Sequence, residues 1–109
     1  MNNISIQTVA EVIILARELA NEPARAEVEF DAFIGSMNQD EKAALTALMW
    51  VGRGSYEPAD FAVAEAAAMA EATTPTASYL KGSPHLAEHL ENGLDLLGYS
   101  VREAEESLL

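Results

Sequence analysis

The sequence predicts an all-α fold, a compact single-domain bundle of about five main helices with short helical turns. Apolar residues recur at helical spacing along most of the chain, and glycine and proline fall between the periodic segments. No run of alternating polar and apolar residues is long enough for a strand. Half of the 109 residues are hydrophobic, so one domain spanning residues 1–109 can bury a core without a metal or a disulfide.

The first two helices follow from the apolar spacing. Residues 6–21 place their apolar side chains on one face, Ser5 precedes them as an N-cap, and Pro23 marks the end of the segment. The next segment repeats the pattern, which predicts a second amphipathic helix with its apolar positions at Ala26, Phe30, Phe33, Ile34 and Met37.

The third helix has the clearest start signal in the chain. Asn38 and Glu41 have the spacing of a capping box, and the helix is expected to run to about Val51. Gly52 follows as a residue that can end the helix in the left-handed conformation.

The fourth helix is expected from Pro58 through residue 72, with the proline in the first turn. It is apolar over most of its circumference. Such a helix is usually buried among others or packed in an oligomer interface.

Shorter elements complete the bundle. The segment "ASYLK" (77–81) fits one turn of helix, and Ser83 with Pro84 is expected to open a longer helix that Gly98 closes. Ser100 and Glu103 repeat the capping-box spacing and predict a short C-terminal helix.

Composition limits the classes of partner and chemistry. Eighteen acidic and six scattered basic residues give a formal charge of −12, which disfavours nucleic acid and anionic membrane as partners. The absence of cysteine excludes disulfide frameworks and thiolate catalysis. The apolar run near the N-terminus is short and is interrupted by Arg17, so we expect neither a signal peptide nor a membrane span, and a cytoplasmic protein.

Three stretches of the chain resemble the bacterial domain-of-unknown-function family numbered 3775. They are "ISIQTVAEVIILARE" at the start, "ALMWVGRG" before an alanine-rich helix, and "YLKGSPHLAEHLENGLDLLGYS". The most specific part is W-x-G-R-G, formed by Trp50, Gly52, Arg53 and Gly54, and L-G-Y-S at 97–100 supports it. The resemblance implies a small all-helical protein and no particular activity.

The W-x-G-R-G segment has two interpretations. Arg53 can offer its planar donors to a carboxylate or phosphate, with Trp50 and Tyr56 as stacking surfaces for a ligand or partner. The structural interpretation places Arg53 at a helix C-terminus, where the dipole repels an anion and favours a cation. Arg53 then binds the last carbonyls or pairs with Glu57 or Asp60, and we favour this interpretation.

The segment "HLAEH" fits H-x-x-E-H, an arrangement in which two histidines on one helical face bind zinc. His85 and His89 would be the ligands and Glu88 the general base, but a third ligand is not evident. We favour a structural or incidental origin for this spacing.

No complete catalytic set is evident, so the sequence predicts a non-catalytic helical module without a cofactor. Its expected role is to bind a partner protein or a second copy of itself, and residues 58–72 would form the interface of such a homodimer. The alternative is a metal-binding protein or metal-dependent hydrolase that uses His85, Glu88 and His89.

Overall fold

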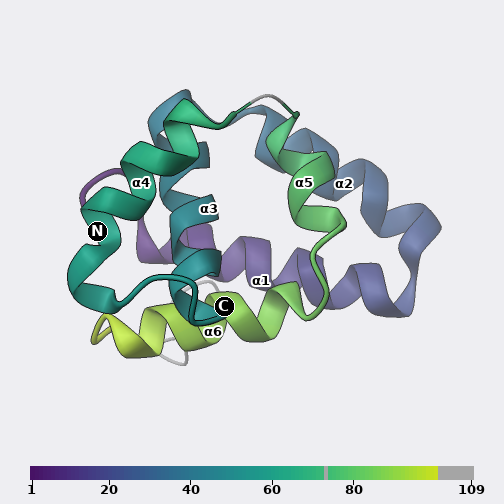
Figure 1. The fold of residues 1–109 in the computed structure, drawn as a ribbon. Coiled ribbons are helices and arrows are strands. Elements are labelled where there is room, and N and C mark those ends of the chain that lie inside the picture. The colour runs from purple at the N-terminus through teal and green to yellow at the C-terminus, as the bar shows by residue number, and fades with distance from the viewer. Residues whose placement is uncertain (73, 101–109) are drawn as a thin grey trace.

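The computed structural model describes residues 1–72 and 74–100, and within these ranges every regular element is helical (Figure 1). The all-α fold predicted from the sequence is confirmed. The Cα radius of gyration is 12.7 Å, close to the value of about 13 Å expected for a compact chain of this length.

Helices α1 (Ile6–Asn21) and α2 (Pro23–Gly35) form a helical hairpin. Ser5 caps α1 as predicted, since its Oγ accepts the backbone N–H of Thr8 at 3.1 Å. Pro23 is the first residue of α2, where its missing N–H costs no hydrogen bond. The sequence therefore marks both the end of one helix and the start of the next.

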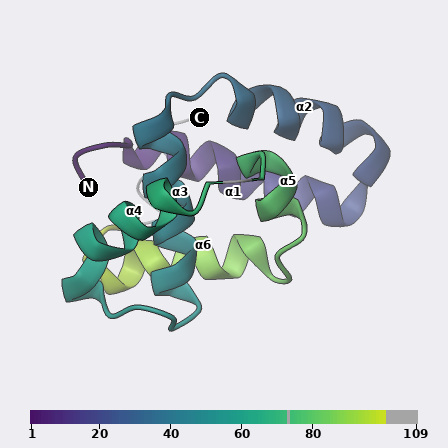
Figure 2. The same cartoon turned by 45° about the horizontal axis from the view of Figure 1, so that its top comes forward.

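Helix α3 (Gln39–Gly52) is the buried centre of the fold. The predicted capping box is present: the Asn38 side chain accepts the backbone N–H of Glu41 at 2.8 Å, and Glu41 Oε1 accepts the N–H of Asn38 at 3.0 Å. All residues from Ala43 to Gly52 are buried. This follows from the position of α3, which packs against α6 along one side and α4 along another (Figure 2).

The fourth predicted helix is shorter than expected and begins differently. Pro58–Asp60 forms a 3₁₀ turn, and α4 covers Phe61–Ala70. Further along the chain, α5 (Thr76–Lys81) is the short helix that was expected at "ASYLK".

Helix α6 covers Leu86–Leu96, so the predicted start at Ser83 and Pro84 is wrong. His85 precedes the helix with φ 59° and ψ 37°, a left-handed conformation that is uncommon for a residue other than glycine. The end of the helix is as predicted, because Gly98 has φ +88° just beyond it.

The backbones of α3 and α6 are in direct contact at Gly52 of α3 and Gly93 of α6. A Cβ atom added at Gly52 would lie 1.7 Å from the carbonyl oxygen of His89, and one added at Gly93 would lie 2.5 Å from the carbonyl oxygen of Leu48. The Asn92 side-chain amide donates to the Gly52 carbonyl at 2.7 Å. Two glycines therefore permit the two helix backbones to approach this closely.

Two further expectations concern the ends of the chain. The predicted C-terminal helix lies outside the described residues, apart from Ser100. No helix within residues 1–72 and 74–100 combines the length and apolarity needed to cross a membrane.

Candidate functional site

Trp50 is the centre of an aromatic cluster at the C-terminal end of α3. It is 7% exposed, and its ring stacks on Tyr56 with centroids 5.7 Å apart and planes at 21°. Its Nε1 donates to the hydroxyl of Tyr79, on α5, at 2.9 Å. The structure thus brings Trp50 and Tyr56 together, stacked on each other, and it adds Tyr79, which sequence reasoning did not single out. The indole N–H is already bonded inside the molecule.

The turn after α3 explains the second glycine of W-x-G-R-G. Ser55 N–H donates to the Trp50 carbonyl at 2.9 Å, and Gly54 N–H donates to that of Val51 at 3.1 Å. This is the Schellman pairing, which needs a left-handed residue, and Gly54 has φ +88°. The prediction that Gly52 supplies this conformation is wrong, because Gly52 is the last residue of α3 and serves the crossing with α6.

Arg53 is an exposed residue at the end of α3. Its Nε donates to Ser55 Oγ at 2.8 Å, and one terminal nitrogen lies 3.8 Å from the Met49 sulfur. Within residues 1–72 and 74–100 its side chain makes neither of the two expected contacts, a hydrogen bond to the last carbonyls of the helix or an ion pair with Glu57 or Asp60. The positive charge is nevertheless placed at the negative end of the helix dipole.

Replacing Arg53 with alanine should therefore have a small effect. We expect the free energy of unfolding to fall by no more than about 1 kcal/mol, the upper end of what a cation at an exposed helix C-terminus contributes. Urea titration of Arg53→Ala measures this loss of stability. Arg53→Lys, which keeps the positive charge, shows how much of the loss is due to the charge. A loss above about 2 kcal/mol in Arg53→Ala would mean that Arg53 makes a stronger contact than its bond to Ser55.

The histidines of "HLAEH" do not share a helical face. Because His85 precedes α6 in the left-handed conformation, only His89 lies inside the helix, and the two rings are edge to face with centroids 6.3 Å apart. Glu88 is exposed on the first turn. In the part of the chain that the structure describes, no group of three or more His, Asp or Glu side chains could hold a metal ion.

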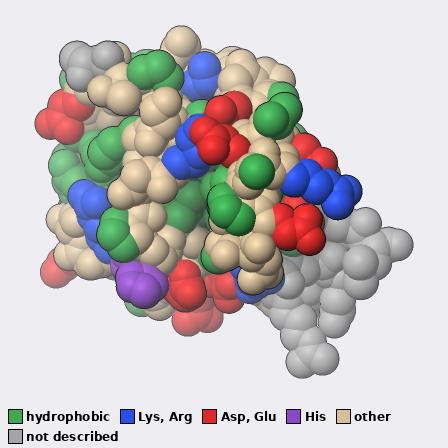
Figure 3. Space-filling view, turned by 90° about the vertical axis from the view of Figure 1, so that its right-hand side faces the viewer, with side chains coloured by type: hydrophobic (Ala, Val, Ile, Leu, Met, Phe, Trp, Pro, Cys, Tyr) green, Lys and Arg blue, Asp and Glu red, His purple; other side chains and the backbone are tan. Residues whose placement is uncertain are grey.

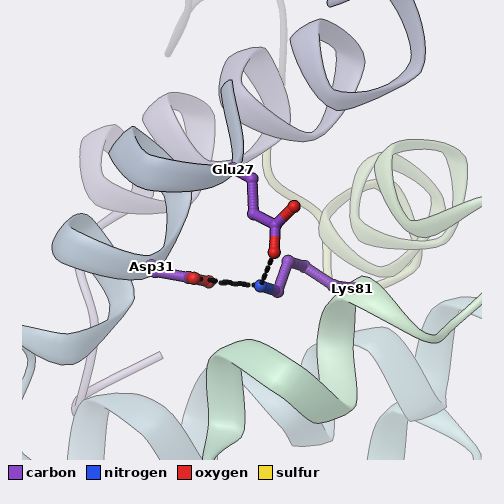
Figure 4. Close-up of polar contacts among 3 residues, drawn as sticks. All are labelled: Glu27, Asp31 and Lys81. Carbon is purple, nitrogen blue, oxygen red and sulfur yellow. Dashed lines mark hydrogen bonds and ion pairs between the residues drawn. The ribbon is translucent and has the colours of Figure 1, made fainter. Parts of the chain in front are cut away.

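A three-residue ionic cluster joins α5 to α2 (Figure 4). Lys81 Nζ lies 3.0 Å from Glu27 Oε1 and 2.7 Å from the nearer carboxylate oxygen of Asp31. These hydrogen bonds, that of Asp31 first, raise the pKa of Lys81 above its ordinary value. The Lys81 side chain is 21% exposed, less than either partner. We call this group the Lys81 clamp.

The Lys81 clamp was not predicted from the sequence. Glu27 and Asp31 are four residues apart, a spacing that places both on one side of a helix. That spacing is a usable signal for a shared partner, but Lys81 follows fifty residues after Asp31. Only the packing of α5 on α2 brings the lysine to them.

Two hollows flank α5. One, of about 560 Å³, is bordered by the C-terminal half of α1, the end of α5 and the start of α6. The other, of about 210 Å³, lies beside Trp50 and Tyr79 and is lined by residues from α3, α4 and α5. Figure 3 shows the side of the molecule where apolar side chains are recessed among charged groups of both signs.

The outer face of α4 is an exposed surface made of apolar side chains. Ala64 and Ala68 are buried toward α3, while Val63 is 60% and Met69 41% exposed. Ala62, Ala66 and Ala70 are also exposed. At 100° per residue these five side chains fall within an arc of about 120°, and none of them is charged. We call them the α4 outer face.

Comparison with protein families identifies the family of this chain. A family model described as "Protein of unknown function (DUF3775)" matches residues 27–99, more than half of the chain. The matched region contains α3 to α6. It does not include the stretch "ISIQTVAEVIILARE" near the N-terminus, which the sequence analysis had also assigned to the family. No match was found among curated proteins or among solved structures.

Proposed function

Because the chain belongs to the DUF3775 family, whose description gives no activity, we propose its function from the surface that its own helices leave uncovered. The protein is an interaction module that associates with a second copy of itself through the α4 outer face. The observation that carries the proposal is the exposure of five uncharged apolar side chains along one helix of a chain with a formal charge of −12.

Shape supports a second copy as the occupant. Val63 and Met69 lie three residues on either side of Ala66, on opposite edges of the face. If two α4 helices cross antiparallel about Ala66, Val63 packs over the partner's Ala70 and Met69 over the partner's Ala62. Each large side chain then meets a small one, as close helix packing requires. The antiparallel direction also opposes the two helix dipoles.

Charge and area determine how strong the association is. Asp60 and Glu71 flank the two ends of the face, so two copies repel each other at its rim. One helical face of ten residues is smaller than the roughly 800 Å² per partner of a standard interface, so the dimer is weak. Since the repulsion is screened over about 8 Å at physiological salt, the dimer tightens as salt is added.

Sedimentation velocity at about 100 μM protein tests the proposal in low and in high salt. We expect a rapidly exchanging monomer and dimer, with more dimer at high salt. A monomer at both salt concentrations would overturn self-association, and it would leave a different protein as the occupant of the face.

A matched pair of variants localises the contact. Val63→Glu places a charge on the α4 outer face, whereas Val28→Glu makes the same change at a valine on α2 that is 72% exposed. We expect Val63→Glu to remove the dimer and Val28→Glu to retain it. Equal loss in both variants would assign the effect to net charge and would contradict the proposed interface.

A further inference from the structure

Helix α5 is attached to the rest of the molecule by few side chains. Of its six residues only Leu80 is fully buried, and the helix packs against α2 and, less extensively, against α3. Ala77 is partly buried and also packs against the core. The remaining attachments are polar: Tyr79 accepts the Trp50 N–H, and Lys81 binds Glu27 and Asp31. A short helix held in this way has the features of a unit that unfolds locally before the core.

The same helix is a wall of both hollows described above. Leu80 and Lys81 border the hollow of about 560 Å³, and Thr76 and Tyr79 border the one of about 210 Å³. Displacement of α5 would therefore enlarge both hollows and uncover Leu80 and the edge of Trp50. Among the helices of the described residues, α5 is the one that lines both hollows, and it has only six residues.

We propose that α5 is a flap that opens as one unit while α1, α3 and α6 remain folded, and that the Lys81 clamp is the latch that keeps it closed. Charge-assisted hydrogen bonds from Nζ to two carboxylates favour the closed state. Because the clamp is partly exposed, salt weakens it, so the open population increases with ionic strength. The flap controls access to the space between α5 and the core beside Trp50.

Native-state hydrogen exchange measures the opening residue by residue. The amides of Tyr79, Gly82 and Ser83 are suitable reporters, since each donates a backbone hydrogen bond within or just after α5. In Lys81→Gln we expect these amides to exchange roughly three to ten times faster than in the wild type, while amides inside α3 keep their rates. Lys81→Arg, which preserves the charge, should restore most of the protection.

The control is Lys42→Gln, which makes the same change of charge on α3 at a lysine whose side chain forms no ion pair in residues 1–72 and 74–100. It should leave the α5 amides unchanged. If α5 and α3 amides accelerate by the same factor in Lys81→Gln, only global unfolding occurs and the flap is refuted. If the α5 amides keep their rates, the clamp is not the latch, which also overturns the proposal.

A second measurement uses the single tryptophan as a probe. Opening of the flap breaks the Trp50–Tyr79 hydrogen bond, so acrylamide should quench the fluorescence of Lys81→Gln more strongly than that of Lys42→Gln. The difference should persist in dilute protein, where the proposed dimer is dissociated. Equal quenching in the two variants would contradict opening at Trp50.

Discussion

Replacing Gly52 with alanine should destabilise the protein by about 3–5 kcal/mol, above the range of ordinary overpacking. The added Cβ would lie 1.7 Å from the carbonyl oxygen of His89 and 2.6 Å from its carbonyl carbon. These are backbone atoms of α6, so no side chain can rotate away to make room. The two helices must move apart at this crossing, although every residue of α3 from Ala43 to Gly52 is buried.

The free energy of unfolding, from urea titration followed by circular dichroism, checks this expectation. Gly35→Ala is the matched control, because Gly35 also ends a helix and an added Cβ there meets no atom within 4 Å. Alanine at that position should be neutral or stabilise by up to about 1 kcal/mol. A Gly52→Ala protein within 1 kcal/mol of the wild type would show that α3 and α6 do not cross this closely.

Replacing Trp50 with alanine should cost about 3–5 kcal/mol, the usual range for truncating a large buried aromatic residue. The substitution removes a side chain that is 7% exposed, its stacking on Tyr56 and its hydrogen bond to Tyr79. Loss of the bond also leaves the Tyr79 hydroxyl without its donor. Circular dichroism must follow the unfolding, since the variant has no tryptophan.

Two less severe variants separate the contributions of the cluster. Tyr56→Leu keeps an apolar cover and should lose about 0.5–1.5 kcal/mol, the value of an aromatic pair. Trp50→Phe keeps an aromatic ring, although a smaller one, and should lose at least about 0.5–1.5 kcal/mol through the missing hydrogen bond. If Trp50→Ala lost less than about 1 kcal/mol, the indole would be dispensable for folding, and the ligand interpretation of Trp50, Arg53 and Tyr56 would gain support.

Features encoded within a few residues could be predicted from the sequence. Ser5, the pair Asn38 and Glu41, and Gly98 act through hydrogen bonds or backbone angles of their own helix ends. Their chemistry is the same wherever the helix lies in the fold. The locations of the helices and the all-α fold were therefore accessible without knowledge of packing.

Features that depend on a distant segment could not be predicted in this way. From the sequence, Gly52 resembles a glycine that ends a helix. Its role is to allow close contact with the backbone of α6, and that contact depends on how α6 packs across α3. Likewise the sequence shows that α4 is apolar almost all round, but not that α3 covers Ala64 and Ala68 and leaves Val63 uncovered. Sequence reasoning about the candidate site was limited for the same reason.

The sequence around His85 is compatible with two different starts of the last described helix. Ser and Pro in succession favour a helix start, and the sequence therefore placed His85 in the first turn. In the structure the chain turns once more before α6, and histidine is among the residues that tolerate the left-handed conformation. Because α6 begins two residues later than predicted, the two histidines of H-x-x-E-H lie in different backbone environments.

The crossing of Gly52 and Gly93 also bears on how the chain folds. The α1–α2 and α3–α4 pairs join neighbours in sequence, so each requires the closure of only a short loop. The α3–α6 contact instead joins segments separated by α4 and α5, and its closure costs more chain entropy before any packing is gained. Local helix pairs can form in many arrangements. The return of α6 to α3 selects one of them, because at Gly52 and Gly93 the two backbones lie too close together for a side chain to fit between them.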